Sequence, residues 1–133
     1  MSEPEFDESV VRADKRSKAI ALIVAIAAFL LVGEFVADVQ FASIVAATAG
    51  IGARLYIPYH ASVRVPESAR TSLSEHPAAG AYHHGAAGIG LVVLSVVAVA
   101  AFAFTHGFVT SVGVGIIAGV VSYVGLSSVL PTG

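Results

Sequence analysis

The chain has 133 residues, of which 56% are hydrophobic and only 12% are charged. Soluble domains carry about 25% charged residues, and this chain has no Asp, Glu, Lys or Arg after Glu75. A soluble globular domain is therefore excluded, and the composition predicts a chain that lies mostly in lipid. The absence of cysteine excludes disulfides and thiolate metal sites, and the formal net charge of -2 gives no reason to expect a nucleic-acid partner.

The first eighteen residues are polar and change sign along their length. Acidic residues come first, and Arg12, Lys15, Arg16 and Lys18 follow them. A secretory signal starts with positive charge and has a short apolar core, so the acidic start and the long apolar stretch that follows argue against one. Residues 1–18 are predicted to be a cytoplasmic polar tail, either frayed or carrying a short interfacial helix.

Residues 19–57 are largely apolar and too long for a single membrane span. One continuous helix would measure about 60 Å at a rise of about 1.5 Å per residue, whereas the hydrocarbon core is about 30 Å thick. Two spans fit if the chain turns near Glu34 and Asp38. The sequence therefore predicts a first transmembrane hairpin with spans over Ala19–Val36 and Val39–Ile57. A chain of three spans with a broken first helix is the alternative.

Residues 58–85 form a polar connector that contains three of the five prolines and four of the five histidines. Pro58 is predicted to end the second span, because proline lacks a backbone N–H and restricts the residue before it. Pro66 is predicted to start a short helix over Glu67–Glu75. Small residues then lead into the next apolar stretch.

Residues 86–130 contain no charged side chain and predict a second transmembrane hairpin. Ala86–Thr105 and Phe108–Leu130 are each about 30 Å long or slightly more as helices, with a break at His106-Gly107. The β-branched residues here do not favour strands, because two strands cannot close a barrel and open sheet edges do not survive in lipid. Residues 131–133 are predicted to be a short tail that only ends the chain.

The seven basic residues indicate which way the chain faces. Four precede the first span, and Arg54, Arg64 and Arg70 lie at or after the end of the second. With four spans, all of them fall on one side of the membrane, which the positive-inside rule makes cytoplasmic. The predicted fold is an all-α integral membrane protein with four transmembrane helices in two tandem hairpins, joined by a polar cytoplasmic connector. Both termini are predicted to be cytoplasmic, in a prokaryotic cell membrane.

Small residues recur every four positions on the second helix of each hairpin. Such stripes let helix backbones approach closely in lipid, where no hydrophobic force drives association. They are predicted to serve helix packing within the chain, with a self-association face on the last helix as the alternative. The two stripes are Ala42, Ala46 and Gly50, and Ser111, Gly115 and Gly119.

Three kinds of polar side chain are candidates for function. Glu34 could couple ion movement, since intramembrane carboxylates are rare and often functional, although a solvated outer turn explains it as well. Arg54 is expected to extend its side chain so that the guanidinium reaches lipid phosphates. The histidines His60, His83 and His84 could meet at one interfacial level and ligate haem or a metal, or be ordinary interfacial residues beside Tyr56, Tyr59 and Tyr82.

The spans lack the buried charges that catalysis or transport usually requires. The sequence therefore predicts a small multi-pass membrane protein without catalytic activity, acting as an accessory or assembly subunit and carrying no cofactor. Its expected partners are the lipid bilayer and either further copies of the chain or a larger membrane complex. The alternatives are a small homo-oligomeric channel or transporter, and a haem- or quinone-associated membrane anchor subunit.

Overall fold

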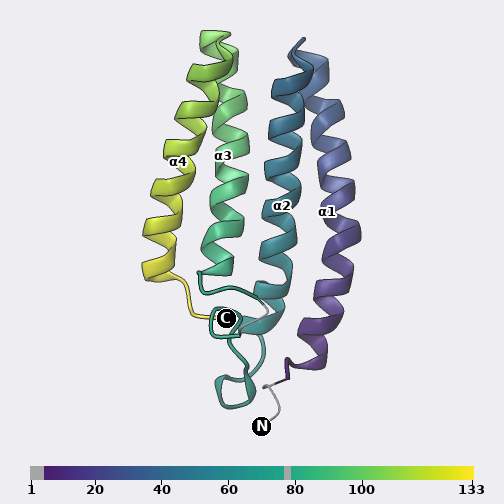
Figure 1. Ribbon diagram of the computed structural model, residues 1–133, viewed down its shortest axis with the longest axis vertical. Coiled ribbons are helices and arrows are strands. Elements are labelled where there is room, and N and C mark those ends of the chain that lie inside the picture. The colour runs from purple at the N-terminus through teal and green to yellow at the C-terminus, as the bar shows by residue number, and fades with distance from the viewer. Residues whose placement is uncertain (1–4, 77–78) are drawn as a thin grey trace.

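A computed structural model describes residues 5–76 and 79–133, and four long helices make up most of that part of the chain (Figure 1). Residues 1–4 of the predicted tail and 77–78 of the predicted connector lie outside the described residues. The helices are α1 (Glu8–Phe35), α2 (Val39–Val63), α3 (His84–Thr105) and α4 (Phe108–Val129), with a short 3₁₀ turn, η1 (Glu67–Ala69), after α2. All four helices are long and apolar enough to cross a membrane, which confirms the prediction of an all-helical fold with four helices of this kind.

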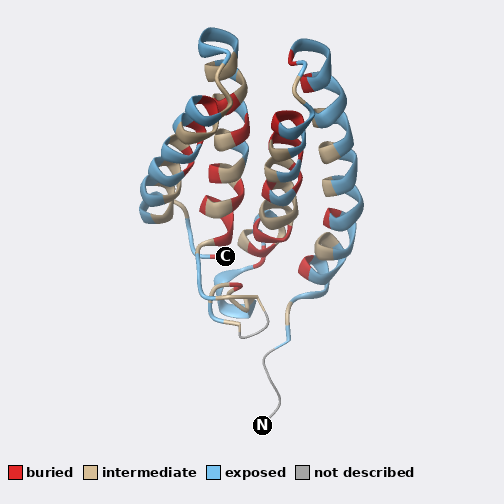
Figure 2. Ribbon diagram, turned by 45° about the horizontal axis from the view of Figure 1, so that its top comes forward, coloured by how far each residue is buried: buried red, intermediate tan, exposed pale blue. Residues whose placement is uncertain are grey.

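The four helices stand side by side in chain order and form an open row. Extensive contacts join α1 to α2, α2 to α3 and α3 to α4, so each helix packs mainly on its neighbours in sequence. A closed four-helix bundle would also bring its first and last helices together around a shared core. Figure 2 shows the consequence, because buried residues concentrate on α2 and α3 while α1 and α4 are largely exposed.

Helix α1 begins well inside the predicted polar tail. Asp7 caps it by accepting hydrogen bonds from the Ser9 backbone N–H at 2.9 Å and from the Ser9 hydroxyl, and these bonds lower the pKa of the Asp7 carboxyl. The 28 residues of α1 span about 42 Å at about 1.5 Å per residue, more than the hydrocarbon core. Figure 1 shows α1 and α2 extending beyond α3 and α4 at the end where the connector lies.

The prediction that Pro58 ends the second helix is wrong, because α2 continues through it to Val63. A proline inside a helix lacks one N–H, so it removes a single hydrogen bond from the ladder. Burial compensates for that loss, since Pro58 and the following Tyr59 are both buried. The chain beyond Pro58 is therefore held as a helix by tertiary packing that local propensity does not reveal.

The predicted short helix over Glu67–Glu75 is also wrong, because only the 3₁₀ turn Glu67–Ala69 forms. Arg70 then adopts an extended backbone with φ -85° and ψ 133°. Its guanidinium turns back and donates to the carbonyls of Val63 and Val65, at 2.9 to 3.2 Å. The arginine thus satisfies the Val63 carbonyl, which the end of α2 leaves without an intrahelical partner, and the Val65 carbonyl just beyond the helix.

Two short turns lie at the end of the molecule away from the connector. Between α1 and α2 the chain turns over 36–38, and the Asp38 side chain caps α2 by accepting from the Phe41 N–H at 3.0 Å. Between α3 and α4 the break falls at His106 and Gly107, and His106 takes the left-handed conformation with φ 53°. Each turn is only a few residues long, so the helices it joins must be antiparallel neighbours.

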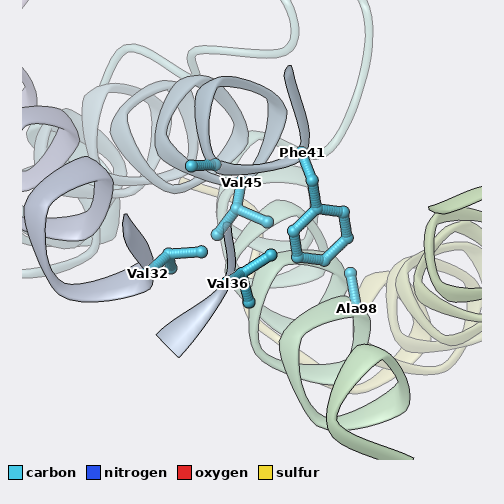
Figure 3. Close-up of a cluster of buried hydrophobic side chains, with 6 residues drawn as sticks. Val32, Val36, Phe41, Val45 and Ala98 are labelled. Atoms are coloured by element: carbon cyan, nitrogen blue, oxygen red, sulfur yellow. The ribbon is translucent and has the colours of Figure 1, made fainter. Parts of the chain in front are cut away.

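Two clusters of buried hydrophobic side chains hold the row together, one at each end. Near the turns, Phe41 and Val45 of α2 pack with Val32, Val36 and Ala98, so that side chains from both hairpins meet (Figure 3). Near the connector, the second cluster joins α1, α2 and the connector through Val10, Tyr59, Val65 and Leu73. The connector is therefore packed onto the helices.

Glycines set the spacing where neighbouring helices cross. A Cβ atom on Gly52 of α2 would lie 2.8 Å from the carbonyl oxygen of Gly88 on α3, and a Cβ on Gly88 would lie 2.8 Å from the Gly52 oxygen. Gly90 and Gly119 form an equivalent pair between α3 and α4, at 2.9 Å in each direction. Contacts this short leave no space for a side chain, so these crossings depend on glycine.

Candidate functional site

Most of the polar side chains that could carry function gather at the connector end of the molecule. This end combines the start of α1, the end of α2, the connector, the start of α3 and the residues after α4 (Figure 1). All seven basic residues of the chain lie within these segments or close to them. The connector end is therefore the candidate functional site.

An ion pair joins α1 to α2 at this end. The Arg54 Nη1 donates to Asp14 Oδ1 at 2.6 Å and to the Ser17 hydroxyl at 2.8 Å. The guanidinium that was expected to reach lipid phosphates thus bonds to the neighbouring helix. The Arg54 and Asp14 side chains are 34% and 42% exposed, so solvent weakens the pair. Asp14 was overlooked in the sequence, although it is the one acidic residue in the basic stretch 12–18.

The residues after α4 are held by a set of hydrogen-bonding groups that we call the tail clasp. It consists of the side chains of Tyr59, Arg70, Ser72 and His83 and the backbone N–H of Leu73. The Tyr59 hydroxyl donates to the Pro131 carbonyl at 2.6 Å, Arg70 Nη1 to the Thr132 carbonyl at 2.9 Å, and the Leu73 N–H to the Gly133 carbonyl at 2.6 Å.

The remaining members of the tail clasp add a contact at each end of the held segment. His83 Nε2 lies 3.3 Å from the Leu130 carbonyl, and the Ser72 hydroxyl donates to the Gly133 carbonyl at 3.2 Å. Four consecutive carbonyls, from 130 to 133, are thus engaged. The expectation that residues 131–133 only end the chain is wrong, because they bind the connector and the ends of α2 and α3.

The three candidate histidines are engaged separately. His83 accepts the Ala86 N–H on Nδ1 at 3.1 Å, which leaves the proton on Nε2 to be donated to the Leu130 carbonyl. His84 is buried, with Nε2 3.2 Å from the Gly80 carbonyl and its ring stacked on Tyr82 at 4.1 Å between centroids. His60 is exposed beside the Tyr56 hydroxyl. Within residues 5–76 and 79–133 no group of three metal-ligating side chains converges.

Glu34 lies at the opposite end of the molecule, near the end of α1, and its side chain is exposed. The neighbouring acidic residue, Asp38, is used as the cap of α2. The structure therefore separates Glu34 from the three candidate histidines and from the Arg54–Asp14 pair by the length of the helices. A role of Glu34 in ion coupling stays a prediction.

Both predicted small-residue stripes face a neighbouring helix of the same chain. Ala42, Ala46 and Gly50 are buried, and a Cβ on Gly50 would lie 3.0 Å from both the Ala21 oxygen and the Ala25 Cβ of α1. The stripe of Ser111, Gly115 and Gly119 is buried on α4. A Cβ on Gly115 would lie 2.8 Å from the Leu94 oxygen of α3.

Two cavities lie at the connector end and share two lining residues, Tyr82 and His84. The larger, of about 460 Å³, lies between α1, α2 and the connector and has the Arg54–Asp14 pair in its wall. The smaller, of about 330 Å³, lies toward the start of α3 and the tail clasp. Both fall in the size range of ligand pockets, about 300–1,000 Å³. The sequence pattern gave no signal for either, because their walls come from segments far apart in the chain.

The polar side chains at this end hold segments of the chain together. Arg54, Arg70 and His83 all make hydrogen bonds within the protein. Comparisons of the chain with protein-family models, with curated proteins and with solved structures found no match.

Proposed function

We propose that the protein is a multi-pass protein of the cell membrane and acts as a non-catalytic accessory or assembly subunit. In this proposal all four helices cross the bilayer, and the connector end, with both termini, faces the cytoplasm. The positive-inside rule supports that orientation, because the basic residues belong to the connector end. The partner is a second copy of the chain or a larger membrane complex, and it binds through an outer helix of the row.

The observation that carries the proposal is the open face of α1. Only 6% of its most apolar stretch is buried within the chain, and α1 has α2 as its extensive neighbour. Leu22, Ile23 and Leu30 are 62 to 65% exposed on this helix. A row of helices with an open end can be extended by another helix without rearranging the contacts already made.

The engagement of the polar side chains supports a structural role over a catalytic one. A general acid, base or nucleophile must be able to reach a substrate, whereas Arg70 donates to the carbonyls of Val63, Val65 and Thr132. His83 likewise has Ala86 and Leu130 as partners for its two ring nitrogens. These groups fix the connector to the helices.

Cross-linking in native membranes tests the proposal, and the lack of cysteine in the chain makes it direct. Leu30→Cys places a thiol on the open face of α1, where the native side chain is 62% exposed. Val32→Cys is the matched control, because Val32 is 7% exposed and faces the core near the turns. A homobifunctional maleimide is expected to join the Leu30→Cys protein to a second polypeptide, and to leave the control as a monomer.

The partner is then identified by mass spectrometry of the cross-linked band. The proposal is abandoned if Leu30→Cys gives no adduct and the protein, extracted in mild detergent at native expression, runs as a lone monomer. An adduct formed equally by the buried Val32→Cys would show random collision or unfolding, and it would count against a specific face.

A further inference from the structure

A groove between α3 and α4 and the smaller cavity of the connector end share one lining residue, Tyr123. The groove has a volume of about 300 Å³, and its lining includes Ala87, Leu94 and Ile116. Tyr123 lines both the groove and the cavity of about 330 Å³. The two hollows together are apolar along the helices and polar at the connector end, which is the division that an amphiphilic molecule requires.

Two glycines belong to the lining of the groove, and Tyr123 lies at its connector end. Gly90 and Gly119 line it where the backbones of α3 and α4 pack closely, so the floor of the groove at this point is backbone. Tyr123 lies one helical turn beyond Gly119, toward the connector. Its hydroxyl accepts a hydrogen bond from the His83 N–H at 3.4 Å. The phenol thus has its apolar ring beside the groove and its oxygen beside the cavity.

The polar cavity is lined by hydroxyl, imidazole and backbone groups that can form hydrogen bonds. Ser74, Tyr82, His84 and Thr132 line it together with Tyr123, and no Asp, Glu, Lys or Arg belongs to its described lining. A phosphate or carboxylate placed here would lose its hydration without gaining a cation, which is costly. Hydroxyl or carbonyl oxygens would instead find hydroxyl and imidazole partners.

We propose that the groove and the polar cavity bind one uncharged lipid. The hydrocarbon chain of this lipid lies along α3 and α4. Its head group, which carries hydroxyl or carbonyl oxygens, occupies the cavity beside Tyr123. An acylglycerol and an isoprenoid quinone share this chemistry. The site does not depend on the subunit role proposed above, because its walls come from α3, α4, the connector and the tail segment of one chain.

Native mass spectrometry of the purified full-length chain in mild detergent tests the proposal. The probes are dioleoylglycerol, a menaquinone with a short isoprenoid chain, and dioleoyl phosphatidylglycerol, each added at the same concentration. One uncharged lipid per chain is expected to remain bound, with an affinity about tenfold or more above that of the anionic lipid. Retention of dioleoylglycerol or of the menaquinone identifies which uncharged head the cavity accepts.

Two variants fill the groove from opposite walls, and a third is the control. Ala87→Phe and Ile116→Phe each place a ring in the groove and are expected to weaken retention of the uncharged lipid about tenfold. Ala100→Phe puts the same ring on an exposed position of α3 and should leave retention unchanged. If Ala87→Phe does not fold, the lipid retention of Ile116→Phe decides whether the groove is the binding site. Tyr123→Phe keeps the ring, removes the hydroxyl, and should weaken retention several-fold.

Three results would overturn the site. The first is unchanged retention in a groove-filling variant that elutes as the wild type does. The second is equal retention of phosphatidylglycerol and the uncharged lipids, which would show ordinary solvation of the helices by lipid. Loss of retention in Ala100→Phe, to the same degree as in Ala87→Phe, would also contradict a defined groove.

Discussion

The crossing of α2 and α3 at Gly52 and Gly88 is the place where one added methyl group has the most direct consequence. In Gly52→Ala the new Cβ would lie 2.8 Å from the Gly88 oxygen, 2.9 Å from Val92 Cγ2 and 3.3 Å from Leu91 Cβ. The nearest of these atoms belongs to the backbone, so the helices themselves must separate. Overpacking of this kind costs about 1–3 kcal/mol, and we expect Gly52→Ala to fall in the upper part of that range.

The control is Gly113→Ala on α4, because nothing lies within 4 Å of a Cβ built on Gly113. Gly113→Ala should raise the free energy of unfolding by up to about 1 kcal/mol, because glycine inside a helix is about 0.5–1 kcal/mol less favourable than alanine. Reversible unfolding in mixed micelles with increasing denaturing detergent, followed by circular dichroism, gives both free energies. If the two glycine variants lose the same stability, the close approach of the hairpins at Gly52 is refuted and only a general helix effect remains.

Three further predictions concern the connector end and the orientation of the chain. Ser62→Ala should raise the free energy of unfolding by about 1 kcal/mol in the same assay, because the buried Ser62 hydroxyl has no hydrogen-bond partner among the described residues. A loss of stability would show that the hydroxyl does form a hydrogen bond in the folded protein. Arg70→Lys should lower the free energy of unfolding by about 2 kcal/mol, since lysine cannot reproduce the planar fork of donors. Protease should also cut the connector of this variant faster. Wild-type stability and wild-type cleavage would refute the tail clasp. The third prediction tests the orientation with an impermeant maleimide. Ser68→Cys on the connector should resist the reagent in intact cells and react after lysis, whereas Phe104→Cys, where the native side chain is 87% exposed near the turns, should react in both. The reverse pattern would show that the connector end faces outward.

Several features of the fold could be predicted from the sequence because they depend on local pattern and on the thickness of the bilayer. The uncharged stretch after residue 85 and the apolar stretch before residue 58 are too long for one span each, so each had to divide. His106 and Gly107 interrupt the second stretch, and α3 and α4 end and begin on either side of them. Asp38 precedes α2 as a capping residue, a role that its side chain suits.

The errors in the sequence-based prediction come from contacts between distant segments. Pro58 would end an isolated helix, yet the burial of Pro58 and Tyr59 carries α2 on to Val63. Arg54 would extend toward lipid if it stood alone, yet Asp14, forty residues earlier, accepts a hydrogen bond from its Nη1. Local pattern reports the preferences of a residue among its neighbours in sequence, and it contains no information about which distant group will be close.

By itself, the sequence determined that this chain forms four long apolar helices and that its basic residues belong to one end, because hydropathy and charge are properties of each segment alone. The tertiary structure decided that the helices stand in an open row, that the residues after α4 are bound by the tail clasp, and where the cavities lie. These features depend on the backbone distances at Gly52, Gly88, Gly90 and Gly119, and on hydrogen bonds between segments that only the folded chain brings together.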